Sequence, residues 1–380
     1  MLILLAIALT LLMISNSYSK RQVLVVGLNP ALQRSIKLDN VVLGSVNRGI
    51  EASVGIGGKG QDVIVAANCM LTKDKKENIP SLLQFLGEGS EGNMLADLIE
   101  KITDIKKNSA DDFSIRTKAK CRTCITLVDT KTKEATEIIE PSEPILESEV
   151  QSLLKRVTEE YNGEIKLKGL VIMGSCPPNC PDDLYSKIIL NTCNSNSKII
   201  LDTATGLNHC FNICKNLGNT PILKVNAREI CKLANVITSS GSESANATPL
   251  NSVIDACKVL GSKYQTSFYA AITDGPFNAY LLKYSYPNTI TSWQYTLPPL
   301  HKSFVNPIGA GDAVASGLSM YICDMIDEIS DEELDFDKKL MKAFAWGLSC
   351  GSSSCLTSKN SVFDMNDCKI IFDSISIQCV

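Results

Sequence analysis

The stretch "NPIGAGDAVASGLSMY", Asn306 to Tyr321, places two glycines and an aspartate directly before an apolar run that reads as a helix. One interpretation is a helix cap, in which Asp312 satisfies the first amides and the glycines form the turn. The other is an anion site. In that case Gly309, Ala310 and Gly311 leave backbone N–H groups bare at the helix N-terminus, with Asp312 beside them as a base.

Short β-branched runs alternate with longer helical patterns along the chain. The runs 22–29, 169–175, 198–204, 221–227 and 269–275 read as buried parallel strands, and helices are expected over 59–70, 92–101, 147–161, 181–191, 227–234 and 250–260. Alternation of this kind is typical of an open, doubly wound α/β fold with a mostly parallel central sheet flanked by helices.

Two segments depart from this alternation. Residues 34–55 and 120–142 read as antiparallel strands, and the second contains the turn-like "DTKTKE" between two alternating runs. The sequence therefore predicts one α/β domain over 20–380 with a small β-sheet lid over a site at the strand ends.

Composition excludes some classes of function. Of the 380 residues 44% are apolar, which is enough for a large core. A net charge of -4 provides no basic field, so nucleic acid is not expected as the main partner. Only two histidines occur, His209 and His301, which disfavours a histidine metal site or a Ser-His-Asp triad.

The N-terminus and the cysteines give conflicting indications of compartment. The apolar stretch 2–14, followed by small residues up to Ser19, predicts a signal peptide over 1–19 and entry into the secretory pathway or an organelle reached through it. An uncleaved anchor, a gene-model artefact, and a location in cytosol or plastid stay open. The fifteen cysteines are scattered rather than clustered, which favours buried free thiols over a disulfide scaffold.

Two further loops carry possible chemistry. "GIGGKGQD", 55–62, follows a strand and opens a helix; its glycines let a ligand approach the backbone and Lys59 adds a positive charge. In "KVNARE", 224–229, Asn226 and Glu229 lie three residues apart on a first helical turn. They could hold the waters of a hydrated magnesium ion, or they could simply cap the helix.

The GAGD segment suits phosphoryl transfer. An aspartate in the first turn of a helix is expected to have a lowered pKa, because the helix dipole stabilises its charge. It can nevertheless accept a proton from a bound hydroxyl. The neighbouring amides would stabilise charge on a transferring phosphoryl group.

In this order the motifs resemble the ribokinase/PfkB carbohydrate-kinase family, and within it the branch of 1-phosphofructokinase and tagatose-6-phosphate kinase. The resemblance runs from about Val23 to about Asp364. It rests on "GLNPAL" (27–32), "GSVNR" (44–48), "GGKG" (57–60), "GSCPP" (174–178), "LDTA" (201–204), "KVNAREI" (224–230) and "GAGD" (309–312).

The resemblance implies roles for individual residues. Asp312 would be the catalytic base, with Gly309, Ala310 and Gly311 as the anion hole. The acceptor would be bound by Gln33, Arg48, Gly57, Gly58, Lys59, Asp62 and Arg122, with the two arginines holding an acceptor phosphate. ATP would contact Lys224, Asn226, Thr273 and Gly275, and Mg²⁺ would be held through water by Asn226 and Glu229. The lid would form a homodimer interface.

Three positions depart from the family pattern. Gln33 stands where an aspartate is usual, Asp62 replaces an asparagine, and Pro307 replaces a threonine or serine. We expect an altered acceptor rather than an inactive protein, because Asp312 is retained.

The main hypothesis is an ATP- and magnesium-dependent kinase acting on a hydroxyl of a sugar or sugar phosphate. Three alternatives are kept. The acceptor could lack a phosphate, as a free sugar or nucleoside does. The chain could be a non-catalytic nucleotide- or sugar-binding descendant. Finally, the glycine loops could be plain turns.

Overall fold

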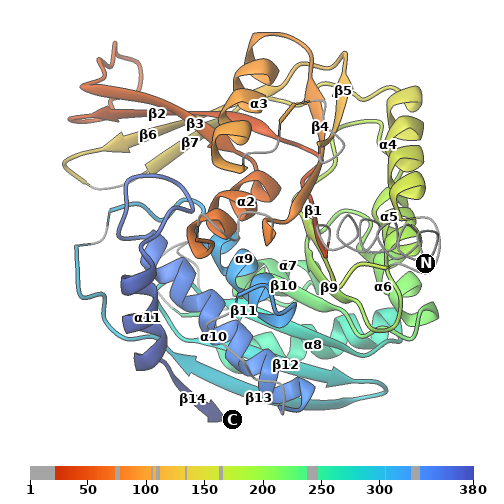
Figure 1. The fold of residues 1–380 in the computed structure, drawn as a ribbon. Helices are drawn as coiled ribbons and strands as arrows, with labels where there is room; N and C mark the ends of the chain where they lie inside the picture. Colours follow the sequence, from red (N-terminus) through yellow and green to blue (C-terminus); the bar gives the residue numbers. More distant parts are fainter. Residues whose placement is uncertain are drawn as a thin grey trace, which may run out of the picture.

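The computed structural model describes residues 22–72, 78–103, 106–107, 112–132, 135–161, 166–237, 247–303, 305–326 and 334–380 (Figure 1). The expected signal peptide lies outside the described residues and stays a prediction. Among the helices of the described part, none is both long and apolar enough to cross a membrane.

A ten-stranded sheet forms the centre of the molecule, in the order β14-β13-β12-β11-β10-β9-β8-β1-β4-β5. Pairing is parallel from β11 to β5 and antiparallel from β11 to β14. The strands are β1 (Val23–Val26), β4 (Ser81–Gly87), β5 (Phe113–Thr117), β8 (Gly169–Met173), β9 (Lys198–Asp202), β10 (Ile222–Asn226), β11 (Phe268–Thr273), β12 (Ala279–Ser285), β13 (Thr289–Thr296) and β14 (Ser376–Cys379). The expected doubly wound, mostly parallel sheet is confirmed.

Helices cover both faces of this sheet (Figure 1). One core packs against α4 (Glu147–Glu160), α5 (Leu184–Thr192), α6 (Leu207–Asn216), α7 (Ala227–Leu233) and α8 (Leu250–Tyr264). The other packs against α2 (Lys59–Met70), α9 (Ala310–Ile322), α10 (Phe336–Ser354) and α11 (Met365–Ser374). Alternate residues of one strand enter different cores: Leu24 joins the first and Val25 the second. Strands buried on both faces explain the continuous apolar runs in the sequence.

A second sheet lies beyond the carboxyl ends of the main strands, beside α3 (Ser90–Thr103) (Figure 1). Its order is β3-β2-β6-β7, built from β2 (Ala31–Leu38), β3 (Glu51–Gly57), β6 (Arg122–Asp129) and β7 (Ala135–Ile139). The pairs β2–β3 and β6–β7 are antiparallel as expected, but β2 and β6 pair in parallel. The expected "DTKTKE" turn is described except for residues 133–134, and Asp129 accepts amide hydrogen bonds from Lys131 and Thr132 within it.

All fifteen cysteines have free thiols. Most of them are buried in the two cores, where sulfur packs as a small apolar group. The structure therefore agrees with the expectation of buried free thiols.

Candidate active site

A cavity of about 470 Å³ lies between the lid and the carboxyl ends of β1 and β8. The chain connections diverge at this pair: the next strand beside β1 is β4 on one side, and the next strand beside β8 is β9 on the other. Open α/β sheets bind ligands at such a switch point. The lining includes seven residues expected from sequence: Gln33, Gly58, Lys59, Asp62, Arg122, Gly309 and Asp312.

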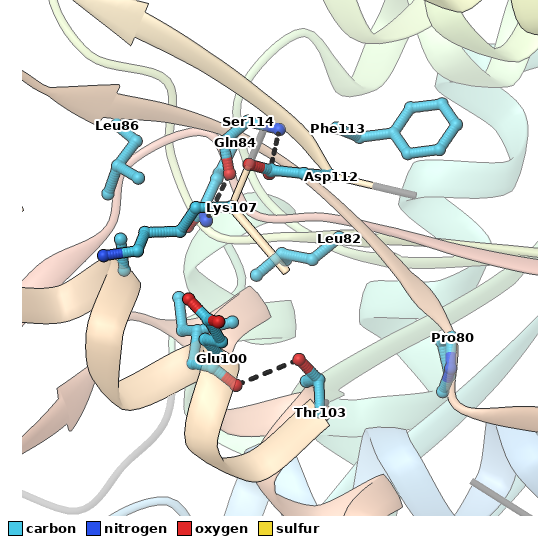
Figure 2. A pocket seen from close by; sticks show the side chains of 12 residues that line it. Pro80, Leu82, Gln84, Leu86, Glu100, Thr103, Lys107, Asp112, Phe113 and Ser114 are labelled. Carbon is cyan, nitrogen blue, oxygen red and sulfur yellow. Dashed lines mark hydrogen bonds between the residues drawn. The ribbon is translucent and has the colours of Figure 1, made fainter. Parts of the chain in front are cut away.

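A different, much smaller cavity of about 30 Å³ lies between α3 and the strands β4 and β5 (Figure 2). Gln84 there donates to Ser114 Oγ at 2.9 Å. The space suits about one water molecule, so it is not a candidate for a sugar or nucleotide.

The N-terminus of α9 distinguishes the two interpretations of GAGD. No side chain caps this helix, and Gly309 takes a left-handed conformation with φ 79°. Asp312 lines the cavity instead of capping the helix. Among the hydrogen bonds found in the described residues, none uses the amides of Gly311 or Asp312. The helix cap is therefore the wrong interpretation here.

One member of the expected anion hole differs from expectation. The amide of Ala310 donates to the carbonyl of Pro307 at 3.2 Å, so it closes the turn and is not bare. Ser361 Oγ donates to the Gly309 carbonyl at 2.9 Å and fixes the turn from the other side. A Cβ on Gly309 would lie 2.3 Å from Ser361 Oγ, which is why only glycine fits at this position.

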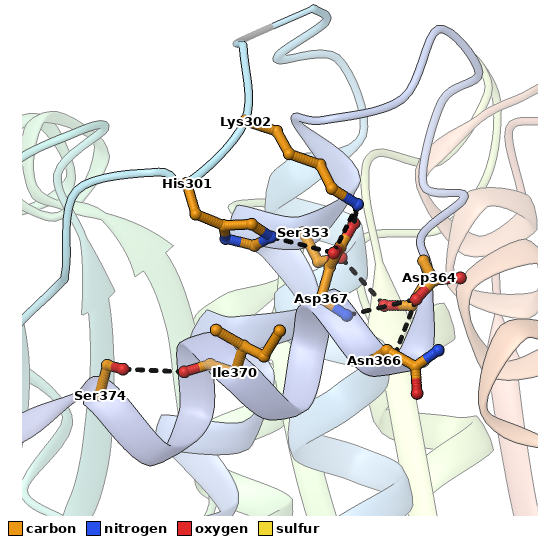
Figure 3. A network of polar contacts seen from close by, with 8 residues as sticks. All are labelled: His301, Lys302, Ser353, Asp364, Asn366, Asp367, Ile370 and Ser374. Atoms are coloured by element: carbon orange, nitrogen blue, oxygen red, sulfur yellow. Dashed lines mark hydrogen bonds and ion pairs between the residues drawn. The ribbon is translucent and has the colours of Figure 1, made fainter.

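The segment preceding GAGD is anchored to α11 (Figure 3). His301 Nε2 lies 2.9 Å from Asp367 Oδ1, and Lys302 Nζ donates to Asp367 Oδ2 at 2.6 Å. Asp364 caps α11 by accepting from the Asp367 amide at 3.2 Å. These contacts tie residues 301–302 to the first turn of α11.

Asp202, at the end of β9, binds two lysines at once. Its Oδ1 accepts from Lys59 Nζ at 2.6 Å and its Oδ2 from Lys224 Nζ at 2.8 Å. Burial would raise the pKa of Asp202, but the two ammonium groups hold it below its usual range. Burial lowers the pKa of Lys59, yet Asp202 more than offsets this and the net shift is upward.

The predicted lowered pKa of Asp312 is wrong in sign. Burial raises the pKa of this carboxyl to about 7, and the negative charge of Asp202 adds to the shift. Lys224 and Lys59 oppose it without cancelling it. Desolvation therefore outweighs the helix dipole, whose effect is modest. A base with a pKa near the working pH is well matched to proton transfer.

Asn226 and Glu229 form a reciprocal capping box at the start of α7. Asn226 Oδ1 accepts from the Glu229 amide at 2.8 Å, and Glu229 Oε2 accepts from the Asn226 amide at 2.9 Å. The helix cap, which the sequence left open as an alternative to a magnesium site, is thus present in the structure. Glu229 is nevertheless close enough to Asp312 and Lys59 to affect their pKa values. In the described part of the chain, no cluster of three His, Cys, Asp or Glu side chains could hold a metal directly.

The GGKG loop is shaped by close packing. Gly58 precedes α2 with φ 104°, and a Cβ there would lie 2.4 Å from Gln61 Oε1. A Cβ on Gly60 would lie 2.5 Å from the Gly27 Cα, so the end of β1 and the start of α2 touch through bare backbone. Gly57 is buried at the end of β3, next to Gln33.

The two arginines that were expected at the acceptor site lie in different places. Arg122 lines the cavity, and its Nη2 donates to the Asn29 carbonyl at 3.2 Å. Arg48 is exposed in the loop between β2 and β3 and does not line this cavity. An acceptor in the cavity therefore meets Arg122 but not Arg48 of the same chain.

The expected nucleotide residues lie at neighbouring strand ends. Lys224 and Asn226 belong to β10, and Thr273 ends β11 beside them, with Thr273 paired to Asn226. Gly275 follows with φ 59°. None of these four lines the cavity, although Lys224 Nζ lies 3.1 Å from where a Cβ on Gly311 would stand.

Several site residues were missed by sequence reasoning. The cavity is also lined by Gly27, Asn29, Gln61, Glu137, Ser175 and Asn360, and Asp202 anchors its two lysines. Asp202 could have been found, because "LDTA" places a carboxylate directly at a strand end. Glu137 gave no such signal, since it lies in an alternating strand among other charged residues.

An α/β sheet, an uncapped helix N-terminus and a carboxyl group at a lidded cavity are the features expected of a phosphoryl-transfer site. The model of the "pfkB family carbohydrate kinase" matches residues 20–361. The chain therefore belongs to the PfkB family of carbohydrate kinases.

Solved structures agree on the fold. Phosphofructokinase-2 from Escherichia coli superimposes with a TM-score of 0.68 at 17% identity, covering 93% of this chain and 98% of that chain. A possible 1-phosphofructokinase from Thermotoga maritima gives 0.67 at 18% identity, covering 94% and 99%. Ribokinase from Giardia lamblia gives 0.65 at 13% identity, covering 92% and 99%.

The protonation of Asp312 should govern activity. A base with a pKa of about 7 must lose its proton to act, so we expect kcat/KM to fall about tenfold per pH unit below about pH 7. Asp312→Asn should lower kcat by about 10²- to 10⁴-fold. Initial rates of wild type and variant across about pH 5 to 9 check this. A pH-independent kcat/KM would rule out Asp312 as the base.

The same substitution should stabilise the protein at alkaline pH. The folded pKa of about 7 lies above the unfolded value of about 3.9, so ionisation of Asp312 lowers the free energy of unfolding as pH rises from about 4 to 7. Asn cannot ionise and escapes this loss. We expect a higher Tm for Asp312→Asn than for wild type at about pH 8, and a smaller difference at about pH 5. Asp373→Asn, at an exposed position of α11, is the charge-matched control. A lower Tm at both pH values would contradict the account.

Proposed function

We propose that this carbohydrate kinase transfers the γ-phosphoryl group of ATP to a hydroxyl of a sugar or sugar phosphate. The observation that carries the proposal is the placement of Asp312. Its carboxylate lines the cavity beside the uncapped N-terminus of α9, where the Gly311 amide has no partner among the described residues.

The chemistry follows from these positions. The acceptor lies in the cavity under the lid, which keeps water from competing for the phosphoryl group. Asp312 takes the proton of the acceptor hydroxyl while the hydroxyl oxygen forms a bond to the γ-phosphorus. The bond between the γ-phosphorus and the bridging oxygen of ATP breaks, and ADP leaves. Amides at the start of α9 stabilise the charge on the transferring group. Asp202 holds Lys59 and Lys224 in place nearby.

Magnesium is proposed as the metal partner of ATP. The donors suit an ion that keeps most of its waters, because Glu229 uses Oε2 in the capping box and has a second oxygen outside that contact. Glu229, with Asn226 beside it, would hold the ion through water. When bound, the ion would neutralise phosphate charge.

A phosphorylated acceptor is the preferred subclass. Arg122 in the cavity offers a guanidinium suited to phosphate, and likeness to phosphofructokinases favours the same class. The competing candidate is an acceptor without a phosphate. It is favoured by the carboxyl groups of Asp62 and Glu137, which also line the cavity.

A turnover panel with Arg122→Ala separates these candidates. Fructose 1-phosphate, fructose 6-phosphate, tagatose 6-phosphate, fructose and ribose are tested with ATP and Mg²⁺. If the acceptor phosphate binds Arg122, the variant should raise KM for sugar phosphates by about 10-fold or more, because a charged hydrogen bond is lost. KM for unphosphorylated sugars should change little. The control is Lys155→Ala, which removes an exposed cation of α4 outside the lid and the cavity.

The other outcomes of this panel are also informative. Equal effects of Arg122→Ala on all acceptors would favour the unphosphorylated class. Binding of ATP and sugars without any turnover that depends on Asp312 would favour a non-catalytic descendant and contradict the proposed function.

We further propose that the lid forms a homodimer interface. Large apolar side chains are exposed on it: Leu43 at 94% and Val46 at 82% exposure lie in the loop between β2 and β3, and Val54 and Ile138 are exposed on the edge strands β3 and β7. Exposed apolar patches of this kind mark interaction surfaces. Light scattering on a sizing column should show a dimer that Leu43→Asp converts to monomer. Ile237→Asp, equally exposed at 94% but outside the lid, should stay dimeric. A monomeric wild type would overturn the proposal.

A further inference from the structure

The cavity-facing side of the lid carries an unassigned carboxylate. Gln33 of β2 pairs with Cys124 of β6, and Cys124 pairs with Ile139 of β7. Thr126, two residues along β6, pairs with Glu137. Residues opposite one another, or two apart in a strand, point to the same face. Gln33, Cys124, Glu137 and Ile139 all line the cavity.

Asp62 provides a second carboxyl group at the same cavity. It comes from the first turn of α2 and is only 5% exposed. Its Oδ1 is buried and has no hydrogen-bond partner among the described residues. A buried polar atom without a partner is costly unless a ligand satisfies it. Burial, with Asp312 and Glu137 adding, raises the pKa of Asp62, so its neutral form can donate a hydrogen bond.

Gln33 is already committed to the lid itself. Its Nε2 donates to Thr126 Oγ1 at 2.7 Å, and this contact is buried. The amide therefore ties β2 to β6. The neighbouring lid strand β7, through Glu137, supplies the carboxylate on this face.

We propose that Glu137 is a specificity-determining residue that accepts a hydrogen bond from a hydroxyl of the acceptor, opposite Asp62. The proposal rests on the proposed function and deepens it. Two carboxyl groups from different elements suit a polyhydroxylated segment, in which one hydroxyl donates to Glu137 and another accepts from Asp62. They disfavour an anionic group at this end of the cavity, so an acceptor phosphate would lie toward Arg122.

The position of Glu137 on a lid strand has a kinetic consequence. The contact with the acceptor exists only while β7 covers the cavity, whereas Asp62 belongs to the body of the protein. Correct acceptors therefore stabilise the closed lid, and acceptors lacking the hydroxyl do not.

The test uses Glu137→Gln, which keeps the shape and removes the charge. We expect KM for the best acceptor of the panel to rise about 10- to 100-fold, as for loss of a charged hydrogen bond, with the effect on KM rather than on kcat. KM for ATP should be unaffected. Glu51→Gln on β3 is the control, because Glu51 is an exposed lid glutamate that pairs with Lys37 at the surface and does not line the cavity. It should leave all constants unchanged.

An unchanged acceptor KM in an active Glu137→Gln enzyme would overturn this proposal and leave the proposed function intact.

A wild type without turnover would contradict the proposed function, and acceptor binding is then measured as the Tm shift that the same five sugars produce in the presence of ATP. Loss of that shift in Glu137→Gln but not in Glu51→Gln supports the role of Glu137. Retention of the shift in Glu137→Gln, or no shift in wild type, refutes it.

Discussion

The arrangement of the site depends on the buried carboxylate of Asp202, which binds Lys59 from the GGKG loop and Lys224 from the main sheet. Losing one partner of such a group leaves uncompensated buried charge, which is strongly destabilising. The contact therefore fixes the start of α2 relative to β9 and β10. It also sets the local charge: two lysines oppose Asp202 and Asp312, and a pKa of about 7 leaves Asp312 partly neutral. The two ammonium groups thus offset the negative charge of Asp202 and Asp312 beside the cavity.

Helix ends complement this field. α2 and α9 both begin after glycines of positive φ, lack side-chain caps and face the cavity. By contrast α10 and α11, which start away from it, are capped by Asp335 and Asp364. Unsatisfied first-turn amides are tolerable where a ligand can use them. A missing cap does not by itself mark a ligand site, since α5, α6 and α8 also lack side-chain caps and do not line the cavity. What distinguishes α9 is a Gly311 amide without a partner among the described residues, beside the cavity-lining Asp312.

Local patterns predicted much of this. The five expected strands and the helices between them were confirmed, because doubly buried strands and amphipathic helices leave clear runs in the sequence. The parallel pairing of β2 with β6 was missed, since these strands are distant in sequence and no turn reveals their direction. Arg48 was placed in the acceptor site by motif alone, but its loop keeps it outside the cavity. The pKa of Asp312 was predicted with the wrong sign because a sequence shows the helix dipole but not the burial.

The departures from the family pattern at positions 33 and 62 show that the residue types alone do not reveal where their polar groups lie. In sequence, Gln33 and Asp62 look like an acid and an amide that have exchanged places. In the structure they are not equivalent: the Gln33 amide joins two lid strands, while Asp62 is buried, lines the cavity and has one carboxyl oxygen without a hydrogen-bond partner among the described residues. An acid left without a partner in a low-dielectric site stays neutral and becomes a donor. In the role proposed for Glu137, this residue would supply the hydrogen-bond acceptor of the lid, and the substrate would meet a different set of donors and acceptors although the residue types are nearly the same.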